Sequence, residues 1–178
     1  RAVSQLRLLD ELRRLRRALQ SREGYHEIVG RSPAMERLRD DVDRLAVQDG
    51  PVWLAGEPGT GKELAARSLH ARSSRAGAPF VLVHCAGLAE AMGSAAEGGE
   101  AALMQAWLEQ AAGGTLYLEG VTDLPLGFQQ RVDRILRENA GGGVRLTAGA
   151  LTTPQQAVEN GQLIDALAVS LGRDTLQL

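Results

Sequence analysis

The sequence predicts an α/β fold in which a parallel sheet is covered by helices on both faces. Short apolar runs typical of buried strands alternate along the chain with longer segments of helical periodicity. One of these strands and one of these helices flank a glycine-rich stretch, Gly56 to Glu63. Ligands of parallel sheets bind at the carboxyl ends of the strands, so we expect this stretch to lie at the binding site.

The first element expected is a helix without breakers over residues 1–22. Its leucines recur at spacings of 4, 3 and 4, as in the seam of a coiled coil. An isolated helix of this length is marginal in water, so we expect a parallel homodimer, with packing on the chain's own domain as the alternative. Residues 1–24 also carry seven arginines against three acids, but no aromatic face that would favour DNA or a membrane. The seam residues are Leu8, Leu12, Leu15 and Leu19.

A break at Gly24 divides the chain into a dimerisation helix, residues 1–24, and a globular part, residues 25–178. Ser32 followed by Pro33 predicts the start of a helix that ends near Asp49. Strands are then expected over 51–55, 80–84, 115–119, 144–150 and 174–178. Helices are expected over 64–70, over 101–112, around 128–136, and over 155–171 with an interruption at Gly161. Residues 86–100 are small and polar, which predicts a loose loop.

The composition indicates a soluble protein with one sizeable core. The chain has 178 residues, of which 44% are hydrophobic and 24% charged, and no apolar run is long enough to span a bilayer. Outside residues 1–24 there is no basic patch of the kind that binds nucleic acid. Cys85, the only cysteine, follows a strand and is expected to be a buried structural thiol. Because the chain begins at Arg1 without a signal-peptide pattern, we expect a piece of a longer cytoplasmic protein.

The stretch between the first strand and its helix has the composition of a phosphate-binding loop. Glycines allow backbone N–H groups to converge on an anion, the helix N-terminus adds positive charge, and a lysine reaches the terminal phosphates. The lysine, Lys62, is the only one in the chain. A glycine-rich turn without a ligand is the alternative. The candidate binding residues are Gly56, Glu57, Pro58, Gly59, Thr60, Gly61, Lys62 and Glu63, the last standing where the general motif has a hydroxyl for Mg²⁺.

Several separate blocks resemble the AAA+ domain of bacterial enhancer-binding proteins, the sigma-54-dependent transcription activators. Ile28 to Met35 resembles the opening I-[IV]-G-x-S-x-x-M, which adds Val29 and Gly30 to the nucleotide site, and Gly56 to Glu63 resembles G-E-S-G-T-G-K-E. Val83 to Ala86 resembles V-N-C-A, and Gly113 to Pro125 resembles G-G-T-L-F-L-D-E-x-x-x-L-P. The resemblance covers about residues 25–172. It implies a P-loop AAA+ core that binds ATP or ADP, a signalling helix before it, and a chain that stops where the family's helical lid begins.

The chain departs from this pattern where the family carries out hydrolysis. The family's Walker B strand ends in Asp-Glu, and here the pair is Glu119-Gly120. By resemblance Glu119 keeps the position that holds Mg²⁺ through water, whereas Gly120 lacks the carboxylate that polarises the attacking water, a loss of about 10²–10⁴ in rate. The family asparagine that switches this glutamate is replaced by His84.

Three further functional elements of the family are missing. Ala150-Leu151 replace the sensor Thr-Asn, and Ile164 and Ser170 stand at the positions of two arginines that act across the subunit boundary. An arginine finger contributes about 10³–10⁵ in rate. The stretch between Leu88 and Gly113 is too short for the G-A-F-T-G-A loop that grips sigma-54.

These features predict a cytoplasmic regulatory domain of a response-regulator-type transcription factor that binds nucleotide but is not an active ATPase. By the resemblance, DNA binding belongs to a domain outside this chain, and no contact with sigma-54 or a membrane is expected. One alternative is a sensor of cyclic di-GMP, with Arg31 and the loop as anion contacts. The others are an empty dimerisation scaffold and, least favoured, an active sigma-54 activator ATPase.

Overall fold

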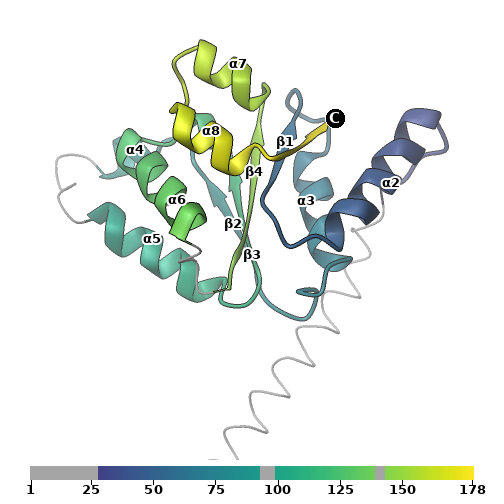
Figure 1. Ribbon diagram of the computed structural model, residues 1–178, viewed down its shortest axis with the longest axis horizontal. Helices are drawn as coiled ribbons and strands as arrows, with labels where there is room; N and C mark the ends of the chain where they lie inside the picture. The colour runs from purple at the N-terminus through teal and green to yellow at the C-terminus, as the bar shows by residue number, and fades with distance from the viewer. Residues whose placement is uncertain (1–27, 93–98, 139–142) are drawn as a thin grey trace, which may run out of the picture.

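The computed structural model describes residues 28–92, 99–138 and 143–178 (Figure 1). The predicted leucine seam of residues 1–24 lies outside the described residues.

Five parallel strands form one sheet in the order β2-β3-β4-β1-β5. The residues of β1 and β4 are all buried, as is all of β3 except its last residue, because these strands lie inside the sheet with helices on both faces. The predicted α/β class is therefore confirmed, and each strand lies within one residue of its expected limits. The strands are β1 Val52–Ala55, β2 Phe80–His84, β3 Thr115–Glu119, β4 Arg145–Ala150 and β5 Asp174–Gln177.

The helices cover the sheet in two layers, which Figure 1 shows on opposite sides of the strands. One layer, α2 and α3, closes a core around Leu54, Leu69 and Tyr117. The other layer, α5 to α8, closes a larger core around Trp53 and Phe128. The described helices are α2 Pro33–Ala46, α3 Lys62–Ala71, α4 Leu88–Met92, α5 Gly99–Gln110, α6 Leu126–Glu138, α7 Pro154–Glu159 and α8 Asp165–Leu171, with the short 3₁₀ helix η2 Val121–Asp123 after β3.

Local capping signals explain the helix starts that were predicted correctly. The Ser32 hydroxyl accepts a hydrogen bond from the Met35 N–H at 3.3 Å, and Pro33 occupies the first position of α2. The amphipathic face of α2 buries Val42 and Leu45 against the sheet. The Ser-Pro signal and the apolar spacing thus specify the same helix.

The predicted helix over 155–171 is in fact two helices, α7 and α8. Thr153 and Gln156 form a capping box at the start of α7, and Gly161 ends it in a left-handed conformation with φ 71°. The chain then extends to Ile164, which is the N-cap of α8 and has φ −76° and ψ 143°. Gly161 therefore terminates one helix instead of merely interrupting a longer one.

The prediction of a loose loop over residues 86–100 was also wrong in part. Gly87, at φ 78°, turns the chain after β2, and the Ala91 N–H then donates to the Gly87 carbonyl at 2.9 Å as α4 forms. Leucine, alanine and methionine favour this helix, although none of its residues is fully buried. Helix α5 covers Gly99–Gln110, close to the expected 101–112, and residues 93–98 lie outside the described part.

Candidate nucleotide site

The glycine-rich loop connects the carboxyl end of β1 to the amino end of α3. Gly59 and Gly61 have φ values of 80° and 89°, and a Cβ added at either glycine would meet no atom within 4 Å. The space next to these two glycines is therefore open, and their backbone adopts turns that other residues rarely adopt. Gly56 differs, because a Cβ there would lie 2.7 Å from the Thr60 hydroxyl, which itself donates to the Glu57 carbonyl at 2.7 Å.

The start of α3 has the features of an anion-binding helix terminus. Gly61 is the N-cap and has no side chain to satisfy the first N–H groups. The Ala65 N–H donates to the Gly61 carbonyl at 2.9 Å, so the N–H groups of residues 62–64 have no acceptor one helical turn back. Together with the helix dipole, these donors would suit the phosphates of a nucleotide.

The Lys62 side chain is buried and folds back onto the loop. Its ammonium group donates to the carbonyls of Gly56 at 2.7 Å and Glu57 at 2.8 Å. An ammonium group has three donors, so one remains for an oxygen of a phosphate. The two bonds hold the only lysine of the chain beside the open face of the loop.

Glu63, the residue at the usual hydroxyl position, is engaged along the helix. Its carboxylate pairs with Arg67 at 2.9 Å, and the Arg67 guanidinium lies 4.7 Å from the centre of the Phe80 ring. The i,i+4 spacing of Glu63 and Arg67 is visible in the sequence, whereas the contact of Arg67 with Phe80 is not, because Phe80 comes from β2. The Glu63 carboxylate is thus held by Arg67, one turn further along α3.

Val29 and Gly30, the other predicted contact residues, lie in a segment fixed by Arg39. The Arg39 guanidinium donates to the carbonyls of Ile28 at 3.0 Å and Gly30 at 2.6 Å. Gly30 has φ 145°, and a Cβ there would lie 2.8 Å from Met35 Cγ, so this turn requires glycine. Val29 is 82% exposed, which leaves its side chain available to a ligand.

The carboxyl end of β3 brings together Glu119, His84 and an aspartate that sequence analysis did not identify. Glu119 and His84 are partners in the β2–β3 register, with His84 Nδ1 and Glu119 Oε2 3.7 Å apart. Gly120 has φ 70°, and a Cβ there would lie 3.0 Å from Asp123 Oδ2. The Asp123 carboxylate therefore lies close to the place where the family's Walker B glutamate begins its side chain.

A divalent ion would find few protein ligands at this end of the sheet. Within the described ranges, no three His, Cys, Asp or Glu side chains are grouped closely enough to hold a metal ion. Mg²⁺ needs only one or two carboxylates when phosphates supply further oxygens, so Glu119 fits such a role with nucleotide.

Cys85 lies against the same carboxylates but is fully buried. Burial raises the pKa of its thiol to about 12, and the charges of Asp123 and Glu119 act in the same direction. The expected structural thiol is thus in the core, and at neutral pH it is protonated and a poor nucleophile.

The sensor position lies directly beside the loop. Ala150 is paired with Ala55 at the ends of β4 and β1, and its carbonyl accepts from the Gly56 N–H at 3.1 Å. Neither Ala150 nor Leu151 carries a polar side chain, and Leu151 is 59% exposed. This position therefore has no side-chain hydrogen-bond donor for a phosphate.

Ile164 and Ser170, which the resemblance aligns with two family arginines, form hydrogen bonds with α6. The Ile164 N–H donates to the Gln129 side-chain carbonyl at 3.0 Å, and the Ser170 hydroxyl donates to the buried Asp133 carboxylate at 2.6 Å. Asp133 also pairs with Arg137 one turn along α6. The contacts of Gln129 and Asp133 with α8 join residues 35 and 37 positions apart, which periodicity does not reveal.

The strand order and the phosphate-type loop after β1 together define a P-loop α/β domain of the AAA+ class. The model of the Sigma-54 interaction domain family matches residues 28–168, and the chain belongs to this family. The resemblance stated from the sequence motifs is confirmed.

Similar proteins include the nitrogen assimilation regulatory protein NtrX of Azorhizobium caulinodans, 39% identical over 144 residues, which are 78% of this chain and 31% of the relative. The C4-dicarboxylate transport transcriptional regulatory protein DctD of Pseudomonas aeruginosa is 40% identical over 147 residues, 78% of this chain and 32% of the relative. The crystal structure of NtrX from Brucella abortus in complex with ATP has a TM-score of 0.70 and 30% identity, and the match covers 85% of this chain and 38% of that one. The chain spans about a third of the length of these curated relatives.

No helix in the described ranges is both long and apolar enough to cross a membrane.

Proposed function

We propose that this domain binds a purine nucleotide, ATP or ADP, at the loop from Gly56 to Glu63. The observation that carries the proposal is the combination of open space next to Gly59 and Gly61, unsatisfied N–H groups at the start of α3, and the Lys62 ammonium group beside them. The similar NtrX structure was determined in complex with ATP. In this proposal Val29 and Gly30 contact the nucleotide, and Glu119 binds Mg²⁺ through water.

The second part of the proposal is that the bound nucleotide is not hydrolysed. A carboxylate that activates water contributes about 10²–10⁴ in rate, and Gly120 cannot supply one. An arginine finger contributes about 10³–10⁵, and neither Ile164 nor Ser170 carries a charge. The hydrogen bond from the Ser170 hydroxyl to Asp133 supports a structural use of that position instead.

The third part concerns the whole protein. We propose that the domain belongs to a cytoplasmic response-regulator-type transcription factor. In support, NtrX is named a regulatory protein and DctD a transcriptional regulatory protein. The domain would pair with a second copy through Leu8, Leu12, Leu15 and Leu19, and it would reach DNA only through a domain outside this chain. The stretch between Leu88 and Gly113, too short in sequence for the family's G-A-F-T-G-A loop, supports the proposal that sigma-54 is not contacted.

Calorimetric titration combined with a phosphate-release assay tests the first two parts. ATP and ADP are expected to bind, and Lys62→Ala is expected to weaken binding at least about tenfold, because a charge-assisted contact to phosphate is lost. No phosphate release above background is expected in the presence of Mg²⁺. Arg72→Ala, the same loss of charge at the opposite end of α3, is a matched control and should bind as the parent does.

Three results would contradict the proposal. Phosphate release that disappears with Lys62→Ala would show an active ATPase. Binding of cyclic di-GMP without binding of ATP or ADP would assign the loop to a second messenger, and binding of none of the three would favour an empty scaffold.

A further inference from the structure

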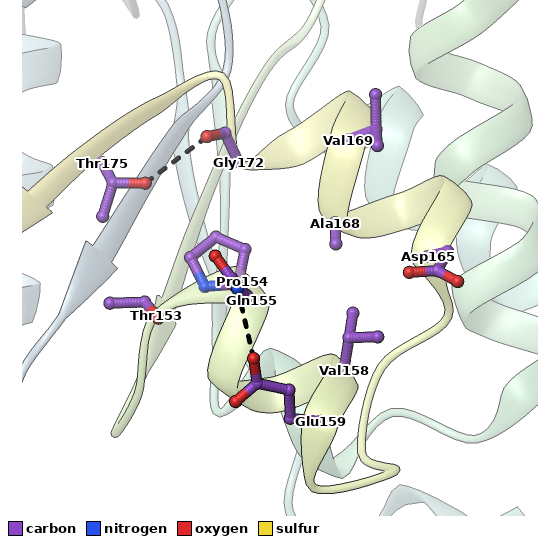
Figure 2. Close-up of a pocket in the computed structure, with 10 residues that line it drawn as sticks. All are labelled: Thr153, Pro154, Gln155, Val158, Glu159, Asp165, Ala168, Val169, Gly172 and Thr175. Atoms are coloured by element: carbon purple, nitrogen blue, oxygen red, sulfur yellow. Dashed lines mark hydrogen bonds between the residues drawn. The ribbon is translucent and has the colours of Figure 1, made fainter.

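Helices α7 and α8 border an open groove of about 690 Å³ at the surface of the domain. Its apolar lining includes Pro154, Val158 and Ala168. In Figure 2 Val158 and Ala168 point toward one another from the two helices, with open space between them. Val169, at the edge, is 75% exposed. We refer to this feature as the α7–α8 groove.

The two charged side chains that line the α7–α8 groove are both negative, whereas the exposed Arg173 follows the lining residue Gly172. From residue 151 to residue 172 the sequence contains two charged residues, Glu159 and Asp165, and both line the groove. Glu159 accepts a hydrogen bond from Gln155 at 3.1 Å, but no basic side chain within the described ranges forms an ion pair with either carboxylate. An apolar lining with two carboxylates that no described ion pair neutralises suits a helix that is apolar on one face and basic beside it.

The chain itself contains a segment with this chemistry. Residues 1–24 carry seven arginines against three acids, and their leucines recur at spacings that place them on one face of a helix. We propose that this segment docks in the α7–α8 groove, with leucines of the seam against Val158 and Ala168 and neighbouring arginines beside Glu159 and Asp165.

Docking and dimerisation would then compete for the same leucines. A helix of 24 residues is about 36 Å long, and one leucine seam cannot be buried in a coiled coil and in a groove at the same time. The α7–α8 groove would therefore oppose pairing of two copies through the segment. This inference does not depend on nucleotide binding, since the groove residues are not those of the loop from Gly56 to Glu63.

Photo-cross-linking in the full chain tests the contact. p-Benzoylphenylalanine is placed at exposed Val169, and, as a matched control, at Val47, which is 82% exposed at the end of α2. After irradiation and proteolysis, mass spectrometry is expected to find cross-links from position 169 to peptides within residues 1–24. In an equal mixture of isotopically light and heavy chains, cross-links within one chain or between two chains both support docking and show which copy supplies the segment. Equal yields from positions 169 and 47, or no cross-link from 169 to this segment, would overturn it.

Charge reversal tests the chemistry of the contact. Glu159→Lys/Asp165→Lys is expected to lower the cross-linking yield from position 169 about fivefold, the effect of losing two surface ion pairs. Glu90→Lys/Glu109→Lys makes the same change on α4 and α5 and should leave the yield unchanged. Raising the salt concentration should lower the yield of the parent but not of the reversed variant. An unchanged cross-linking yield in Glu159→Lys/Asp165→Lys would show that the two carboxylates do not bind the segment. Nucleotide titration of the same variants tests the phosphate loop separately.

Discussion

Gly120 has a backbone conformation that disfavours any side chain. The residue is in the left-handed region, at φ 70° and ψ 44°, and Asp123 lies where a new side chain would start. Gly120→Glu is therefore expected to lower the free energy of unfolding by about 1–2 kcal/mol, from backbone strain and repulsion by Asp123, without restoring phosphate release. Urea denaturation and the phosphate assay measure the two effects.

Gly120→Ala is the control for this change, because it adds the strain but not the charge. Its free energy of unfolding should fall by about 1 kcal/mol. Steady phosphate release from Gly120→Glu would show that the missing carboxylate is the only obstacle to hydrolysis.

Cys85 gives a prediction for the pH dependence of stability. Its pKa is raised to about 12 by burial, whereas an unfolded thiol titrates near 8.5. Between these values the unfolded chain loses the proton and the folded chain keeps it, so stability falls as pH rises from about 8.5. The free energy of unfolding of the parent should fall by about 1–2 kcal/mol more between pH 7 and pH 10 than that of Cys85→Ala. Identical slopes for the two proteins, from urea denaturation at each pH, would contradict this.

At the scale of elements, the strands and capped helices were predictable because their signals are local. Adjacent residues predict both features: Ser32-Pro33 predicts the start of α2, and Gly56 to Glu63 predicts the turn between β1 and α3. The division of 155–171 into α7 and α8 is different. The N-cap of α8, Ile164, donates its N–H to Gln129 of α6. The spacing of apolar residues along a helix does not predict such a contact with another helix. The position of Asp123 beside Gly120 was not predicted for the same reason. It depends on the turn that the chain makes after β3.

Gln129 connects three elements and should be important for the stability of α8. Its buried amide donates to the carbonyls of Leu124 at 2.9 Å and Gln162 at 3.0 Å, and it accepts from Ile164. Gln129→Leu keeps the volume but leaves these backbone groups without partners, so we expect a loss of about 2–4 kcal/mol. Gln130→Leu changes the exposed neighbour on the same helix and should change stability by less than about 0.5 kcal/mol. Equal unfolding midpoints for the two variants in urea would argue against a role for Gln129.

Across the whole molecule, the two ends of the sheet differ in the residues that they carry. The carboxyl ends of the strands hold the candidate nucleotide site, and the amino ends are joined by two arginines. Arg75 pairs with Asp49, whose pKa it lowers through their hydrogen bonds, and it also donates to the Gly113 carbonyl at 3.1 Å. Arg145, at the start of β4, is buried and binds the end of α2. These contacts connect residues 26 to 100 positions apart, and composition alone does not predict them.

Arg145 allows the separation of the two ends to be tested. Its guanidinium donates to the carbonyls of Leu45 at 2.8 Å and Gly50 at 3.0 Å, and burial lowers its pKa. Arg145→Met fills much of the same space but leaves both carbonyls without this donor, so the free energy of unfolding should fall by about 1–3 kcal/mol. Because the change is at the amino ends of the strands, ATP affinity measured by calorimetry below the unfolding transition should stay within about twofold of the parent. Arg134→Met, on the exposed face of α6, is the matched control and should change neither quantity. A large loss of affinity in folded Arg145→Met would show that the phosphate loop depends on the opposite end of the sheet.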